Sequence, residues 1–140
     1  MNMDRATQIT YLLLRLVSGL LFLQAGGMKI LGWFGGMPPN GGTATPWTQI
    51  WIGGILELVG GLLILLGLFT RPTAFILSGM MAVAYLQFHA PNGGWPAQNQ
   101  GIPAVLFCFI FLYMAARGGG DYSLDAMMRG RRGVAAKAGY

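Results

Sequence analysis

The chain has 140 residues, of which 54% are hydrophobic and 9% charged, and its formal net charge is +5. Soluble domains carry about 25% charged residues, so this composition indicates a membrane protein. A soluble four-helix bundle would show a polar stripe on every helix, and residues 58–69 show none, which excludes that class. We interpret the positive charge as a topology and lipid-contact signal, and we expect no nucleic-acid partner.

Four apolar segments, 9–31, 48–69, 73–89 and 101–117, predict an all-α integral membrane protein with a bundle of four transmembrane helices. A helix needs about 20 residues to cross the hydrocarbon core, so the first two segments are long enough and the last two are short. The first segment carries Arg15 and no clear small-residue cleavage site, so we expect it to remain as a span. This domain takes residues 1–126.

Positively charged residues predict the orientation of the bundle. Arg5 precedes the first segment, Arg71 lies between the second and third, and Arg117 begins a basic stretch after the fourth. The other two links contain no Lys or Arg. By the positive-inside rule, both termini are expected in the cytoplasm. The basic tail, 127–140, is expected to be a disordered cytoplasmic end in solvent, with lipid contact as the alternative.

Glycines recur on the same helical faces as the ionisable residues of the first two segments. Small residues let helix backbones approach closely in lipid, so these faces are expected to pack inside the bundle. The expected packing glycines are Gly19, Gly26, Gly53, Gly60 and Gly61.

Five polar side chains fall within or near the predicted bilayer core: Arg15, Gln24, Lys29, Glu57 and His89. A charge at mid-bilayer costs about 2.5 to 3.5 kcal/mol, so we expect these groups to form a buried polar cluster facing the bundle interior. Glu57 has two candidate cations. We expect Arg15 to be its partner, because Lys29 can extend its side chain to the outer surface. Such a pair is compatible with a structural clasp and with a ligand or proton site.

The chain offers few ligands for a metal or a haem. It has one histidine and one cysteine, which cannot supply a metal site, a bis-histidine haem or an intramolecular disulfide. We therefore predict no metal and no intrinsic cofactor. Cys108 is interpreted as a packing residue, and His89 as a hydrogen-bonded histidine or a headgroup contact, with a ligand-binding role as the alternative.

Four stretches carry a resemblance to a known family. They are RLVSGLLFLQAGGMKI at 15–30, ELVGGLLILLGLFTR at 57–71, Phe88 with His89, and GGGDYSLD at 118–125. In this order and spacing the chain resembles the DoxX family of small four-helix bacterial membrane proteins, related to the DoxD subunit of thiosulfate:quinone oxidoreductase. The positions that match the family pattern are Arg15, Lys29, Glu57, Arg71 and His89.

The resemblance implies a bacterial inner-membrane protein associated with redox or quinone metabolism. This association comes from the resemblance alone and not from composition or spacing. It implies a subunit more than a self-sufficient enzyme, holding a quinone or other small ligand near the polar cluster. The expected partners are the lipid bilayer and a membrane complex or a second copy of the chain. The alternatives are a non-catalytic accessory or assembly subunit of a respiratory or photosynthetic complex and, third, a small transporter.

Overall fold

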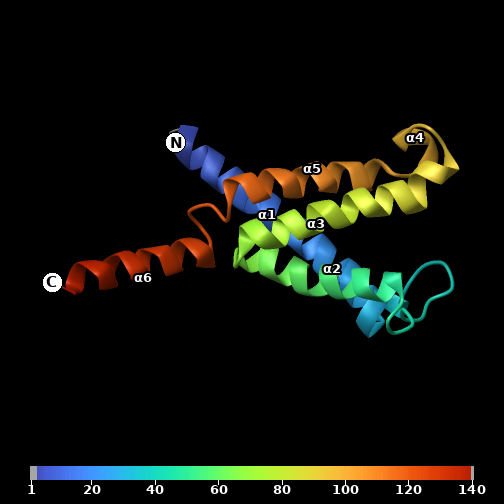
Figure 1. Cartoon of the computed structure of the whole chain (residues 1–140), viewed down its shortest axis with the longest axis horizontal. Coiled ribbons are helices and arrows are strands. Elements are labelled where there is room, and N and C mark those ends of the chain that lie inside the picture. The colour runs from blue at the N-terminus through green and yellow to red at the C-terminus, as the bar shows by residue number, and fades with distance from the viewer. Residues whose placement is uncertain (1–2, 140) are drawn as a thin grey trace.

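The computed structural model describes residues 3–139, and Figure 1 shows a bundle of helices. The helices are α1 (Met3–Leu31), α2 (Gln49–Leu66), α3 (Thr70–Ala84), α4 (Pro96–Asn99), α5 (Ile102–Arg117) and α6 (Leu124–Ala138). Short helical turns are η1 (Trp33–Gly35), η2 (Tyr85–His89) and η3 (Ala90–Asn92). An all-α fold is confirmed for the described residues, which contain an isolated bridge between Gly36 and Gly42 but no strand.

Three helical segments are long and apolar enough to cross a membrane. They are Asp4–Leu31, Gln49–Leu66 and Thr70–Asn92, with 28, 18 and 23 residues. Helix α5 is apolar but has 16 residues, or about 24 Å at 1.5 Å per residue, against a core about 30 Å thick. The membrane-spanning character of the first three predicted segments is therefore supported by length and composition, and a fourth span stays a prediction.

Helices α1 and α2 form a pair held at close range by glycines. A Cβ on Gly26 would lie 2.3 Å from the backbone nitrogen of Leu58, and one on Gly61 would lie 2.4 Å from that of Leu23. Such separations leave no room for any side chain, so the two backbones are in direct contact. Gly19 makes the same kind of approach to α2, while Gly60 faces Leu77 of α3.

Gly53 does not have the packing role expected from its helical face. A Cβ at Gly53 would meet nothing within 4 Å, whereas one at Gly54 would lie 3.0 Å from the Lys29 and Ile30 side chains. Since successive helical residues are about 100° apart, the small residue that meets α1 is the next one along the chain. Gly53 instead lines a cavity described below.

Helices α3 and α5 form the second pair, and Phe22 of α1 joins it to the first. Within the pair, Ser78 Oγ donates a hydrogen bond to the Cys108 carbonyl oxygen at 2.7 Å. The Phe22 ring packs edge-on against Phe107 and Phe111 of α5, with centroids 4.9 and 4.7 Å apart. The apolar core at this junction includes Ile64, Leu77, Phe111 and Met114, all at most 1% exposed.

The two ends of the bundle differ in what they carry. In Figure 1 the beginning of α1, the turn between α2 and α3, and α6 lie at one end, here called the terminal end. The link 32–48 and α4 lie at the opposite end, here called the loop end. The expectation of a disordered tail is wrong for the described residues, because they continue into α6. Ser123 caps this helix by accepting a hydrogen bond from the Ala126 backbone N–H at 3.1 Å.

Candidate functional site

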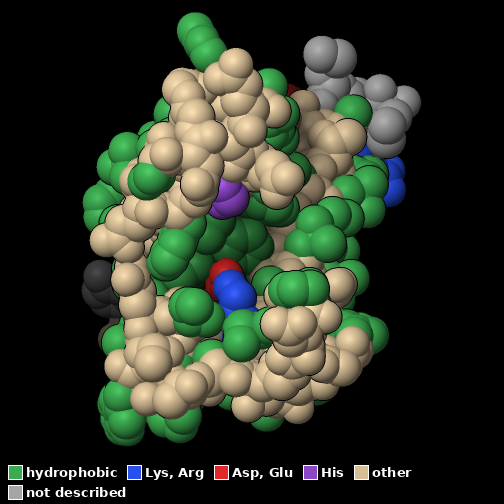
Figure 2. All heavy atoms as spheres, turned by 90° about the vertical axis from the view of Figure 1, so that its right-hand side faces the viewer, with side chains coloured by type: hydrophobic (Ala, Val, Ile, Leu, Met, Phe, Trp, Pro, Cys, Tyr) green, Lys and Arg blue, Asp and Glu red, His purple; other side chains and the backbone are tan. Residues whose placement is uncertain are grey.

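A cavity of about 630 Å³ lies between the α1/α2 pair and the α3/α5 pair. Figure 2 looks into it from the loop end and shows hydrophobic walls around charged atoms, with the histidine near the rim. Four methionines contribute to these walls: Met28, Met37, Met80 and Met81. The polar side chains of the lining are Lys29, Gln49, Glu57 and His89. The volume lies within the usual range of small-molecule sites, which is about 300 to 1,000 Å³.

The charged atoms belong to an ion pair between α1 and α2. Lys29 Nζ donates to both carboxylate oxygens of Glu57, at 2.7 Å each. The Glu57 side chain is 8% exposed and that of Lys29 is 30% exposed. Close packing at Gly26 and Gly54 sets the helix separation that allows this contact. The expectation that Arg15 pairs with Glu57 is wrong: Lys29 turns inward to the carboxylate instead of extending to the surface.

Arg15 belongs to the terminal end of the bundle and bonds to backbone. Its Nη1 donates to the Gly119 carbonyl oxygen at 2.5 Å and its Nη2 to that of Tyr122 at 2.8 Å. Arg15 precedes Lys29 by fourteen helical residues, or about 21 Å of rise. The acceptors of the guanidinium therefore lie in the loop after α5. Arg15 bonds to two backbone carbonyls there, and not to the carboxylate of Glu57 as expected.

Gln24 lies outside the cluster as well. Its side chain is exposed on the surface of α1. Gln24 follows Arg15 by nine residues, and nine steps of 100° place it on the opposite side of the helix from Arg15. Of the five residues expected to cluster, the structure brings Lys29, Glu57 and His89 to one cavity and leaves the other two elsewhere.

His89 reaches the cavity at a change of helical geometry. Helix α3 ends at Ala84 and continues as a π-helical turn, η2, through His89. A π turn holds more residues than an α turn and therefore changes the direction in which the next side chains point. His89 Nδ1 lies 3.0 Å from the Asn99 carbonyl oxygen. Because a carbonyl can only accept, Nδ1 carries the proton, and in the neutral ring Nε2 is left as a hydrogen-bond acceptor.

A set of contacts at the terminal end ties the ends of the helices together, and we call Tyr11, Arg15, Arg71 and Asp125 the terminal clasp. Tyr11 Oη donates to the Gly118 carbonyl oxygen at 2.5 Å. Arg71 Nη1 donates to the carbonyl oxygens of the last turn of α5, at 3.2 Å for Ala115. These bonds satisfy carbonyls that a helix end leaves without partners.

Asp125 completes the terminal clasp from the start of α6. Its carboxylate oxygens accept the backbone N–H groups of Phe69 and Thr70, at 2.9 Å each. Partial burial raises the pKa of this carboxyl, but the hydrogen bonds from Thr70 and Phe69 outweigh it and the pKa is lowered. Sequence reasoning missed this role, although Asp125 ends the GGGDYSLD stretch on which the family resemblance rests.

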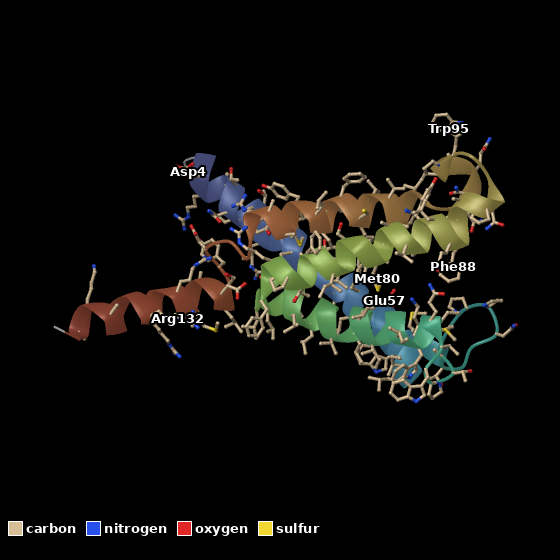
Figure 3. The ribbon with its side chains drawn as sticks, in the orientation of Figure 1. Asp4, Glu57, Met80, Phe88, Trp95 and Arg132 are labelled. Carbon is tan, nitrogen blue, oxygen red and sulfur yellow. The ribbon has the colours of Figure 1, made fainter. Side chains whose placement is uncertain are left out.

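Apolar members of the cavity were also missed from sequence. Figure 3 labels Glu57, Met80 and Phe88 in the region between α2 and α3 near the loop end. Met80 and Phe88 line the cavity with Glu57. Met80 lies one helical turn before Ala84, where α3 changes geometry, and from sequence alone it would be interpreted as an ordinary core residue. Only its position opposite a buried carboxylate marks it as a wall of the site, where its flexible thioether can adapt to a bound molecule.

The cavity offers a charge-neutral set of hydrogen-bonding groups. Two bonds from the ammonium of Lys29 go to Glu57, which leaves the third N–H for another acceptor. His89 contributes an imidazole near the rim. Within residues 3–139, no three His, Cys, Asp or Glu side chains are grouped to hold a metal ion. The arrangement suits a neutral molecule with an apolar body and carbonyl or hydroxyl groups.

Comparison with known proteins places the chain in a family. No solved structure matches it. It is 36% identical over 128 residues to an uncharacterized protein of Haemophilus influenzae, covering 89% of this chain and 94% of that one. It is 28% identical over 132 residues to the inner membrane protein YqjF of Escherichia coli, covering 90% and 97%. The model of the DoxX family matches residues 10–90, a range that includes all four polar residues of the cavity, and the chain belongs to the DoxX family.

Proposed function

We propose that this protein binds a neutral, lipid-soluble ring compound of the quinone class in the cavity between its two helix pairs. The observation that carries the proposal is the position of the Lys29–Glu57 pair and of His89 in one apolar cavity. A quinone ring has carbonyl groups on opposite sides and no charge. It can accept from the third N–H of Lys29, while its quinol form can donate to an imidazole nitrogen.

The charge balance of the site favours this class over ionic ligands. Glu57 compensates Lys29 at contact distance, so a bound anion or cation would meet no unbalanced charge. Desolvating such an ion would therefore be offset only weakly, whereas a neutral ring loses little on leaving the bilayer for an apolar cavity. Protonatable side chains beside the ring fit a role in quinone metabolism, in which protons accompany electrons.

Calorimetric titration of protein in lipid nanodiscs tests the proposal, with 2,3-dimethoxy-5-methyl-6-decyl-1,4-benzoquinone as the probe and empty nanodiscs as the blank. We expect saturable binding. The Lys29→Gln/Glu57→Gln double variant keeps the side chains close in size and the cavity neutral, but it loses the charged donor. A hydrogen bond to a charged group contributes about 1.5 to 3 kcal/mol, so binding should weaken about tenfold or more.

Lys137→Gln is the matched control, because this lysine lies on the exposed surface of α6 and far from the cavity lining. It should bind the quinone as the unaltered protein does. The proposal is wrong if the unaltered protein binds no more quinone than empty nanodiscs, or if the double variant binds it equally well.

We propose that the chain works as a ligand-holding subunit of a larger membrane complex, in which a quinone held beside Lys29, Glu57 and His89 would exchange electrons with a partner protein. Purification from native membranes in a mild detergent tests this part separately. A co-purifying membrane oxidoreductase supports it, and migration only as a monomer or homo-oligomer argues against it. A chain that co-purifies with a complex but binds no quinone would instead be the non-catalytic accessory subunit.

We also propose that α5 is a fourth span and that both termini face the cytoplasm of a bacterial inner membrane. Arg5 and Arg71 lie in the first turns of α1 and α3, and Arg117 is the last residue of α5. These helix ends lie at the terminal end, which the positive-inside rule then assigns to the cytoplasmic side. The related YqjF is named as an inner membrane protein. In whole cells carrying Cys108→Ser, an impermeant maleimide should label Gly94→Cys but not Arg132→Cys. Labelling of both, or of Arg132→Cys alone, contradicts this orientation.

A further inference from the structure

The cavity has two side walls of different construction. On the side of α1 and α5, Phe22 is 5% exposed and packs against Phe107 and Phe111, so aromatic rings fill the seam. On the side of α2 and α3, helix contact is close where Leu77 meets Gly60. From the short turn that joins them at the terminal end, these two helices diverge toward the loop end in Figure 1. The second seam therefore has helices that diverge beside the cavity, whereas aromatic rings fill the first.

Gly53 has no side chain to fill its part of that seam. It lines the cavity, and a Cβ built on it would meet no atom within 4 Å. Across the seam, Val83 of α3 also lines the cavity and is 46% exposed. A side chain that faces both the cavity and the surroundings forms a wall one side chain thick. We call the opening between Gly53 and Val83 the window.

The outer edge of the window is bridged by a side-chain hydrogen bond. Gln49 Nε2 donates to Gln87 Oε1. Gln49 precedes Gly53 by four residues on α2, and Gln87 follows Val83 by four residues and lies in η2. The bond therefore lies about one helical turn nearer the loop end than the window. It ties the helices together beyond the window and leaves the window itself to apolar atoms.

We propose that the window is a lateral portal through which a ligand with a linear apolar chain enters from the bilayer, its ring going to Lys29 and Glu57 and its chain remaining between α2 and α3 in lipid. This rests on the proposed function for the identity of the ring. The cavity of about 630 Å³ holds a substituted ring and the first part of a chain. A longer chain must leave through a wall, and this wall has the window.

Two quinones that differ only in the chain test the portal: the decyl compound named above and its analogue with hydrogen in place of the decyl group. Gly53→Leu is designed to fill the window, and the Cβ that it adds meets no atom within 4 Å. Gly79→Leu is the matched control, since a Cβ there also meets nothing within 4 Å, and Gly79 does not line the cavity. Leu21→Trp narrows the opposite seam, where Leu21 lines the cavity and is 44% exposed.

We expect Gly53→Leu to weaken binding of the decyl quinone at least tenfold and that of the chainless quinone less than twofold. Gly79→Leu should leave both affinities within twofold, and Leu21→Trp should not discriminate between the two quinones. The portal is wrong if Gly53→Leu weakens both quinones equally, because the leucine would then be filling the ring site. It is also wrong if Leu21→Trp, and not Gly53→Leu, discriminates between the two quinones.

A second measurement needs no quinone and separates failure of the portal from failure of the proposed function. A bimane label on Ala25→Cys, in a Cys108→Ser background, reports from the cavity wall of α1. Phosphatidylcholine with doxyl groups on its acyl chains should quench it in nanodiscs. Adding Gly53→Leu should at least halve the quenching, and adding Gly79→Leu should not change it. Equal quenching in all three proteins overturns the portal, whereas absence of quinone binding with the expected quenching overturns only the quinone assignment.

Discussion

A double-mutant cycle around Glu57 tests which cation is its partner. Lys29 Nζ lies 2.7 Å from the carboxylate, and the two side chains are 30% and 8% exposed. Breaking a fully buried pair costs about 3 to 5 kcal/mol and an exposed pair about 0 to 1 kcal/mol. The Lys29–Glu57 pair lies between these limits, so we expect a coupling free energy of about 2 kcal/mol between Lys29→Met and Glu57→Gln.

The same cycle with Arg15 should show almost no coupling. Arg15→Met removes the donors to Gly119 and Tyr122 and will destabilise the bundle more than Lys29→Met, but it touches nothing that Glu57 touches. Residues without shared partners add within about 0.5 kcal/mol. Where Arg15→Met is too unstable to purify, Arg15→Lys replaces it, since it shortens the reach and keeps the charge.

Equilibrium unfolding in mixed micelles with increasing sodium dodecyl sulfate provides the free energies of unfolding for both cycles. A coupling near zero for Lys29, or one above about 1 kcal/mol for Arg15, would refute the assignment of the ion pair. It would also remove the basis for a charge-neutral cavity, because Glu57 would then face the cavity without its lysine.

Two further predictions concern the packing of the bundle and its stability at low pH. Gly26→Ala places a Cβ 2.3 Å from the Leu58 backbone nitrogen and should lower the thermal unfolding midpoint of the protein in nanodiscs by several degrees. At Gly79 the added Cβ of alanine meets open space. Gly79→Ala should therefore raise the midpoint slightly, because alanine favours helix by about 1 kcal/mol over glycine. The pKa of Asp125 is lower in the folded protein than in the unfolded chain, so its contribution is complete above the unfolded value of about 3.9 and is lost as pH falls through the folded value. Asp125→Asn should therefore lower the midpoint at pH 7 and reduce its decline between pH 5 and pH 3; an unchanged decline would contradict the role of this carboxylate in the terminal clasp.

Sequence periodicity was sufficient to find the apolar helices α1, α2, α3 and α5 and the face on which α1 and α2 meet, but it did not find α6. Glycines at steps of three and four along both segments marked that face, and the structure has backbone contact at Gly26 and Gly61. The pattern failed by one residue at Gly53, because the 100° step between neighbours is too small a difference to resolve without the partner helix. For the same reason the window could not be predicted, because it depends on Gly53 having no neighbouring atom within 4 Å of its Cβ position.

The partner of Glu57 was not predictable from depth and charge alone. Arg15 and Lys29 share one face of α1 and lie on either side of Glu57 in depth, so both were candidates. The two cations differ in the other hydrogen-bond acceptors that lie within their reach. The loop after α5 presents the carbonyls of Gly119 and Tyr122 to Arg15, and an unpaired buried carbonyl is costly. No residue type in the sequence records the direction of a backbone carbonyl.

The positions that match the family pattern thus divide into two groups with different physical roles. Arg15 and Arg71 hold backbone carbonyls at the terminal end, where the helices converge. Lys29, Glu57 and His89 face the cavity toward the loop end, where α2 and α3 separate. A bundle tied firmly at one end can leave a space at the other without losing its fold, since the contacts that stabilise it are made elsewhere. The arginines of the first group therefore stabilise the bundle at the terminal end, and the carboxylate in the apolar helix α2 is stable because the Lys29 ammonium lies 2.7 Å from it.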